Sequence, residues 1–189
     1  IIIVDPSSGK SKTRGDFTSM WVIGTGVDGN DYVVDGVRDR LNLTERTEKV
    51  FELVRRWKPS AVGYEQYGLQ ADIEYIKLEQ ERQQYRFKIT PVGGATKKED
   101  RIRRLIPWFE DGRIYLPHTL PYTDTTGKQV DLIKTFLDTE YASFPVARHD
   151  DMFDSLARLA EPDLKLPTPQ KQEDHSVIGF EAIDNEMGY

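Results

Sequence analysis

The sequence opens with Ile1-Ile2-Ile3-Val4-Asp5, an apolar run that ends in a carboxylate. A second apolar run, Ala61-Val62-Gly63-Tyr64, ends in Glu65, and a third acidic segment reads His149-Asp150-Asp151-Met152-Phe153-Asp154. Short apolar runs of this kind predict buried strands. A carboxylate left unpaired beside buried apolar residues is costly. Three such sites predict that the carboxylates converge on something positively charged.

Ligand sets made only of oxygen atoms suit Mg²⁺ or Mn²⁺. Paired ions of this kind drive in-line cleavage of phosphodiester bonds. The acidic segments therefore predict a metal-dependent nuclease, in which two ions are held by the carboxylates.

The composition is that of a globular domain and excludes several other classes. The 189 residues fit one domain with a sizeable core, cysteine is absent, and no apolar run approaches the roughly 20 residues that span a bilayer. We therefore expect an intracellular protein without disulfides, a thiolate metal site or a membrane segment. Because the chain starts Ile-Ile-Ile-Val, without Met or a charged leader, we expect a piece of a longer polypeptide rather than a signal peptide.

Charge is distributed unevenly along the chain. Residues 161–189 hold seven acids and two bases, a net of −5, so the first 160 residues carry only −1 of the total −6. This predicts a domain over residues 1–161 and an acidic, flexible tail over 162–189. Near-neutral charge with a basic face is compatible with binding to phosphate backbones, although runs of charge are usually only solvated faces.

The order of predicted elements indicates the fold. Strands are expected at 1–6, 17–25, 32–38, 61–65, 87–92 and 113–116, and helices at 44–57, 69–84, 97–110, 130–141 and 150–160, with a loop or small hairpin at 118–127. Residues 27–31 predict a hairpin turn, Thr44 an N-cap and Pro59 a helix stop. This order is that of an α/β, ribonuclease H-like fold, a mixed central sheet flanked by helices. In that fold the first and fourth strands are adjacent, which makes Asp5 and Glu65 neighbours.

Several acids have a second interpretation. Acids in the first turn of a helix are favoured by its dipole, so capping explains one of Asp150, Asp151 and Asp154 but not all three. Because Asp150 and Asp151 point in different directions, we expect one of them to be the ligand in any given state. His149 fits a ligand, an orienting donor or a plain N-terminal residue equally well. Asp16, at the entrance to the second strand, fits an auxiliary ligand or an exposed strand start.

A basic helix follows Gly93-Gly94. Its charged residues are Lys97, Lys98, Arg101, Arg103 and Arg104. We expect one basic helix face near the site to contact DNA, with Lys97 and Lys98 at the scissile phosphate or the duplex. By contrast, Gly9-Lys10-Ser11 lacks the preceding glycine of a P-loop, which excludes nucleotide binding at that point.

Taken in order, these motifs resemble the nuclease domain of the large terminase subunit of tailed bacteriophages. The pieces that carry the resemblance are Asp5-Pro6-Ser7-Ser8-Gly9, Gly15-Asp16-Phe17, Tyr64-Glu65, Lys97-Lys98-Glu99-Asp100-Arg101-Ile102, the segment 110–117, Phe144-Pro145 and the segment 149–157. They span about residues 1–160. The chain is more distantly similar to RuvC-type resolvases.

The resemblance implies an endodeoxyribonuclease that cuts concatemeric viral DNA during genome packaging, in the cytoplasm of the host. It implies that Asp5 bridges two Mg²⁺ or Mn²⁺ ions completed by Glu65 and Asp151, with Asp150, Asp154 and Asp16 as less certain ligands. It also implies double-stranded DNA, the portal and the small terminase subunit as partners, and an N-terminal ATPase motor that this chain lacks.

Two other functions fit the sequence. One is a Holliday-junction resolvase or transposase-like nuclease of the same fold, which junction preference and oligomeric state would distinguish. The other is a non-catalytic DNA-binding or docking module with inert carboxylates, which replacing Asp5 with Asn would reveal.

Overall fold

The computed structural model describes residues 1–7, 17–66, 70–94, 96–147, 149–161 and 164. The strands are β1 (Ile2–Asp5), β2 (Thr18–Thr25), β3 (Asp31–Asp39), β4 (Val62–Glu65), β5 (Ile89–Val92), β6 (Ile114–Tyr115), β7 (Pro121–Thr123) and β8 (Gln129–Asp131). The helices are α1 (Leu43–Trp57), α2 (Gln70–Arg82), α3 (Lys98–Glu110), α4 (Leu132–Thr135), the π-helix η1 (Phe136–Tyr141), α5 (Asp151–Ala157) and the 3₁₀ turn η2 (Arg158–Ala160). None of the described helices combines the length and apolar character that a membrane span needs.

Six strands form one mixed sheet in the order β5-β4-β1-β2-β3-β6. β1 runs parallel to β4 and antiparallel to β2, and β2 pairs antiparallel with β3. The predicted neighbours β1 and β4 are therefore adjacent, with Val4 opposite Tyr64 in the register. This confirms the α/β, ribonuclease H-like arrangement expected from the order of elements.

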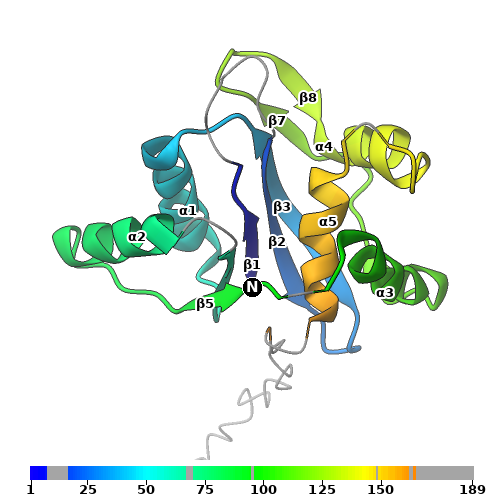
Figure 1. Cartoon of the computed structure of the whole chain (residues 1–189), viewed down its shortest axis with the longest axis horizontal. Helices are drawn as coiled ribbons and strands as arrows, with labels where there is room; N and C mark the ends of the chain where they lie inside the picture. Colours follow the sequence, from blue (N-terminus) through cyan, green and yellow to red (C-terminus); the bar gives the residue numbers. More distant parts are fainter. Residues whose placement is uncertain (8–16, 67–69, 95, 148, 162–163, 165–189) are drawn as a thin grey trace, which may run out of the picture.

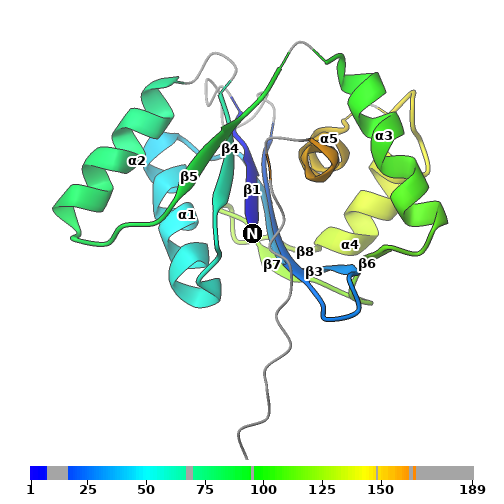
Figure 2. The same cartoon turned by 90° about the horizontal axis from the view of Figure 1, so that it is seen from below.

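Helices cover both faces of the sheet. Figure 2 shows α1 and α2 on one side and α3, α4 and α5 on the other. The side chains of β1 alternate between the two layers: Ile1 and Ile3 join the core under α5, while Ile2 and Val4 join the core under α1. Because β1 is buried on both faces, its sequence is continuously apolar rather than alternating.

Turns and caps explain most of the local boundaries. The β2–β3 hairpin turns at Gly29, whose φ of +80° suits glycine. The predicted N-cap Thr44 is wrong, because Asn42 caps α1 in a reciprocal capping box with Glu45. The C-terminal boundary is as predicted: α1 ends at Trp57, with Lys58 in the left-handed conformation just before Pro59.

The segment predicted as one helix over 130–141 is the largest error in the predicted elements. Its first residues form β8, which pairs antiparallel with β7 in a hairpin beyond the main sheet (Figure 1). Asp131 ends β8 and caps α4 by accepting from the backbone N–H groups of Ile133 and Lys134. A wider π-helix then follows over Phe136–Tyr141. The hairpin provides the cap, so the helix starts later than the apolar pattern suggests.

Candidate active site

A cavity of about 330 Å³ lies where β1, β4 and the start of α5 meet. Its lining is Asp5, Pro6, Ser7, Phe17, Glu65, Lys98, His149, Asp150, Asp151 and Asp154. The fold therefore brings together five carboxylates that are up to 149 positions apart in the sequence. Asp16, the remaining predicted ligand, lies outside the described residues.

Asp5 and Glu65 face each other at the ends of adjacent parallel strands. The Asp5 carboxyl is hydrogen-bonded to Glu65, and burial, followed by the nearby charge of Glu65, raises the pKa of Asp5 well above its ordinary value. Two carboxylates in this position repel each other unless a proton or a cation lies between them.

Asp150 and Asp151 have different surroundings. The Asp150 Oδ1 atom is 2.5 Å from the Lys98 Nζ atom, which makes a direct ion pair at the start of α3. By contrast, the Asp151 Oδ2 atom is buried and has no hydrogen-bond partner among the described residues; the His149 Nδ1 atom is 3.9 Å away. Burial raises the pKa of Asp151, against the lowering effect of Lys98 and Arg38.

Asp154 is held by Arg101. The Arg101 Nε and Nη2 atoms donate to the two Asp154 oxygens at 2.7 Å each, and both side chains are buried. Such a two-point pair is the strongest form of charge-assisted hydrogen bonding. Arg101, predicted to contact DNA, is committed to this internal pair. Lys97, at the N-cap of the same helix, and Arg104 within it are exposed.

Glu65 has a cationic partner that the sequence analysis missed. The Nη2 atom of Arg158 donates to Glu65 and its Nη1 atom donates to Glu161 at 2.6 Å, while the arginine side chain is 2% exposed. Spacing could have found this residue, because Asp151, Asp154 and Arg158 follow one another by three and four positions on a helix and so share a face.

The donors fit a divalent cation in chemistry, although they are not arranged as a finished ligand set. Among the described residues, no three His, Asp or Glu side chains are positioned to hold a metal ion as they stand. The cavity nevertheless contains a buried carboxylate oxygen without a hydrogen-bond partner on Asp151 and a carboxyl on Asp5 whose ionisation is disfavoured. Both features are what a bound cation would relieve, and oxygen donors suit Mg²⁺ or Mn²⁺.

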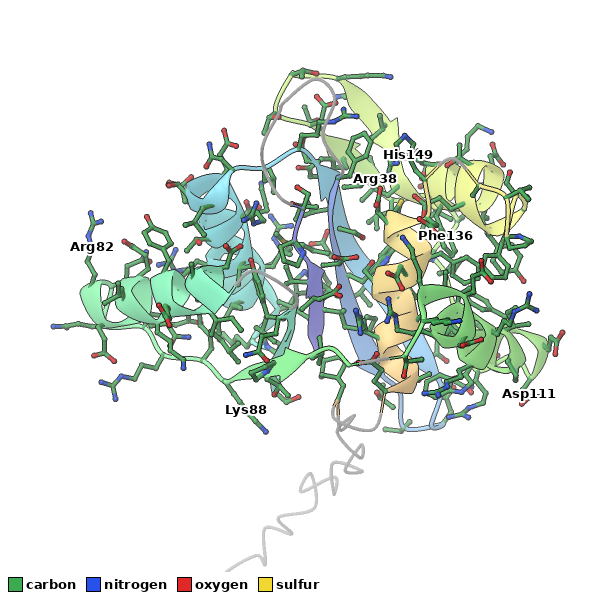
Figure 3. The ribbon with its side chains drawn as sticks, in the orientation of Figure 1. Arg38, Arg82, Lys88, Asp111, Phe136 and His149 are labelled. Carbon is green, nitrogen blue, oxygen red and sulfur yellow. The ribbon has the colours of Figure 1, made fainter. Side chains whose placement is uncertain are left out.

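The cavity lining also has an aromatic part, Phe17 and His149, with two arginines stacked on Phe17. Phe17 contacts the edge of His149 at 5.7 Å between ring centroids, and the guanidinium groups of Arg38 and Arg40 each lie 3.8 Å from the centre of the Phe17 ring. Figure 3 shows Arg38 and His149 on this side of the molecule, near the start of α5. Phe17 also borders a second hollow of about 290 Å³, whose charged lining is Arg38, Arg40, Lys128 and Asp124.

Residues 2–160 match the family described as the terminase RNaseH-like domain. The chain belongs to this family. Comparison with curated proteins gives no match. The match covers the described fold almost completely and agrees with the resemblance that the ordered motifs indicated.

Solved structures of terminases are similar to this family member in fold. The large terminase nuclease from thermophilic phage G20c with bound magnesium has a TM-score of 0.51 and 19% identity, over 84% of this chain and 78% of that chain. The human cytomegalovirus terminase nuclease domain, manganese-soaked and inhibitor-bound, has a TM-score of 0.58 and 13% identity, over 84% and 79%. The HK97 bacteriophage large terminase has a TM-score of 0.50 and 9% identity, over 84% of this chain and 38% of that one.

Proposed function

We propose that this domain is a metal-dependent DNA endonuclease that cuts concatemeric viral DNA during genome packaging. The observation that carries the proposal is the convergence of Asp5, Glu65 and Asp151 on one cavity, where Asp151 leaves a buried oxygen unpaired. Membership of the terminase RNaseH-like family supports a nuclease, and magnesium and manganese accompany two of the similar structures.

In this proposal Asp5, Glu65 and Asp151 would hold two Mg²⁺ or Mn²⁺ ions, with Asp5 as the ligand that both would share. When bound, such a pair supplies an activated water and stabilises the leaving 3′-oxygen. Asp150, Asp154 and Asp16 are auxiliary candidates. Asp154 is the least available of the described acids because Arg101 already occupies both of its oxygens.

The cationic side chains at the cavity take two roles. Arg158 and Arg101 are buried and orient Glu65 and Asp154. The Lys98 side chain is 40% exposed at the cavity rim, where its ammonium can meet a phosphate. Burial opposes its charge, but the hydrogen bond to Asp150 and the nearby acids prevail and raise the pKa of Lys98, which keeps it protonated at neutral pH.

Double-stranded DNA would run across the cavity between two basic borders. Lys97, just before α3, and Arg104, on α3, are exposed, and Arg40 and Lys128 line the adjoining hollow beyond Phe17. Phosphate backbones are bound through such cations. By family membership we further propose an N-terminal ATPase motor domain, the portal and the small terminase subunit as partners, and the host cytoplasm as the place of action.

Cleavage of supercoiled plasmid tests the proposed function. Wild-type protein should linearise and degrade the plasmid with Mg²⁺ or Mn²⁺ and not with EDTA, and a folded Asp5→Asn variant should not. Faster cutting of a four-way junction than of linear duplex would instead support a resolvase. No cutting by folded wild-type protein with either metal would leave a docking module as the better account.

A further inference from the structure

The helix that presents Asp151 is capped by a residue from another element. A helix leaves its first N–H groups without internal partners, and a side chain just before the helix usually accepts from them. Asp150 occupies that position in α5 but makes no capping hydrogen bond, because its carboxylate pairs with Lys98 instead.

Glu140 provides the missing acceptor. Its Oε2 atom accepts from the backbone N–H groups of both Met152 and Phe153 at 2.9 Å, across a gap of twelve and thirteen residues. The Glu140 side chain is fully buried. Its position follows from η1, where Phe136, four residues earlier, packs in the core beneath α5.

A buried carboxylate needs a reason to be retained, since burial raises the pKa of Glu140 to about 7. Its Oε1 atom has no hydrogen-bond partner among the described residues, and the Arg38 Nε atom lies 3.4 Å away in an ion pair. Arg38 in turn stacks on Phe17 at the cavity wall. Glu140 therefore connects the first turn of α5, through Arg38, to Phe17 in the cavity lining.

We infer that Glu140 is a positioning residue for the metal site: as a distant cap, it fixes the first turn of α5 and thereby the Asp151 carboxylate, and it leaves Asp150 free to face the cavity. Asp150 is free only of the capping role, since its carboxylate stays paired with Lys98 in the cavity lining. The inference rests on the proposed metal-dependent nuclease. Other contacts hold this helix as well: the Trp21 indole N–H donates to the Met152 carbonyl at 2.9 Å, and the Ser19 and Ser155 hydroxyls are hydrogen-bonded at 2.7 Å. Among the described residues, the bonds from the Met152 and Phe153 N–H groups to a side chain are those to Glu140.

Two substitutions at Glu140 separate the effect of side-chain length from the effect of the carboxylate charge. Glu140→Gln keeps the length and one oxygen, which can still accept both N–H groups, but removes the charge. Glu140→Asp keeps the charge but is one methylene too short to reach both groups. Asp138→Asn is the matched control, because Asp138 lies on the same helical segment, is exposed and pairs only locally with Lys134 at 2.5 Å.

Binding of Mn²⁺ alone, measured by calorimetry on the full chain, gives the main readout. Loss of a residue that orients a metal ligand typically weakens affinity by about 10–100-fold. We expect that loss in Glu140→Asp, and we expect Glu140→Gln and Asp138→Asn to stay within about threefold of wild type. Cleavage rates at saturating Mn²⁺ should follow the same order.

Amide hydrogen exchange at Met152 and Phe153 tests the cap without metal or DNA. Exchange there should accelerate in Glu140→Asp and stay near the wild-type rate in Glu140→Gln. If Glu140→Asp behaves as wild type, or if Glu140→Gln is as impaired as Glu140→Asp, the positioning role is wrong. If wild-type protein binds Mn²⁺ and shows the expected amide exchange but cuts no DNA, the proposed nuclease function is wrong. The role of Glu140 as the cap of α5 is then still supported.

Discussion

Arg101 and Asp154 hold each other through two hydrogen bonds of 2.7 Å, although 53 positions separate them in the sequence. One was predicted as a DNA contact and the other as a metal ligand. The pair joins α3 to α5 at the cavity, whose lining includes Asp154. The packing of α3 against α5 therefore includes an internal ion pair. Lys98, three residues before Arg101 on α3, lines the cavity.

Replacing Arg101 with Leu should therefore destabilise the fold and not merely weaken DNA binding. Removing one partner of a buried ion pair typically costs about 3–5 kcal/mol, because the remaining charge is left without compensation. Urea unfolding would measure the loss. Arg104→Leu, on the same helix but exposed, should change the free energy of unfolding by less than about 0.5 kcal/mol. Equal effects for the two variants would contradict the assigned role of Arg101.

Asp5→Asn should stabilise the metal-free protein at neutral pH. Folding raises the pKa of Asp5, through burial first and Glu65 second, so the folded state disfavours the ionised form. The cost of ionisation therefore appears as pH rises above the ordinary value of 3.8 and is complete above the raised pKa. We expect the variant to be more stable by roughly 1–3 kcal/mol at pH 7–8, which is the cost of an uncompensated buried polar group.

The pH dependence checks the sign of this prediction. Denaturant unfolding in EDTA should show the advantage of Asp5→Asn shrinking as pH falls and vanishing below about pH 4. Saturating Mn²⁺ should reverse the order, since a ligand at 100 times its Kd stabilises the protein that binds it by about 2.7 kcal/mol. A variant that is less stable than wild type at pH 8 without metal would refute the account of Asp5.

Tyr64, immediately before Glu65, belongs to a buried polar network on the other face of β4. Its hydroxyl donates to the Asp72 Oδ2 atom at 2.8 Å, and Arg46 donates to the same oxygen at 2.5 and 3.1 Å. Tyr64→Phe removes one of three bonds and should cost about 1 kcal/mol. Asp72→Ala leaves Arg46 buried without its carboxylate partner and should cost about 3–5 kcal/mol. Thermal or urea unfolding would measure the stability of both variants. If both lose only about as much stability as Tyr64→Phe is expected to lose, the network does not stabilise the fold as described.

Lys97 and Lys128 should each contribute to DNA binding through phosphate contact alone. Each Ala variant should weaken binding evenly across sequences and reduce the slope of log affinity against log salt by about 1. Fluorescence anisotropy with duplex DNA in EDTA, at several salt concentrations, would measure the slope. Lys88→Ala is the control, since this exposed lysine lies at the opposite end of the molecule from His149 in Figure 3. If the slope is unchanged in both the Lys97 and the Lys128 variants, the proposal that DNA crosses the cavity between these two residues is wrong.

The ends of the strands were predictable from the sequence because burial on both faces leaves an unmistakable pattern. Ile1–Asp5 and Ala61–Glu65 are continuously apolar up to their carboxylates, and the element order then made β1 and β4 neighbours. Asp151, from the acidic segment at a helix start, and Lys98, from the basic helix after Gly93-Gly94, also line the cavity. The caps were missed for two different reasons. Asn42 is the stronger capping residue and forms a local capping box with Glu45, so the sequence already favoured it over Thr44. Asp131 becomes a cap because the β7–β8 hairpin ends there.

The buried charges could not be predicted in the same way. Glu140 reads as an ordinary surface residue of an amphipathic helix, and only its tertiary partners show why it is buried. The spacing of Arg158 from Asp151 and Asp154 indicates which face it occupies, but not that its partner is Glu65. Arg101 looked like one of several bases on a solvated face, because sequence periodicity does not say which base faces α5. The tail over 162–189 and Asp16 fall on positions that, apart from residue 164, lie outside the described residues, so those predictions stay as they were made.

The most direct test of the metal-site claim is an anomalous diffraction measurement at the manganese edge on crystals of the wild-type domain soaked in Mn²⁺. The account predicts two anomalous peaks inside the cavity, in contact with Asp5, Glu65 and Asp151, and their loss in crystals of Asp5→Asn. Peaks bound elsewhere, or an empty cavity at millimolar Mn²⁺ with the Asp5–Glu65 hydrogen bond intact, would contradict it.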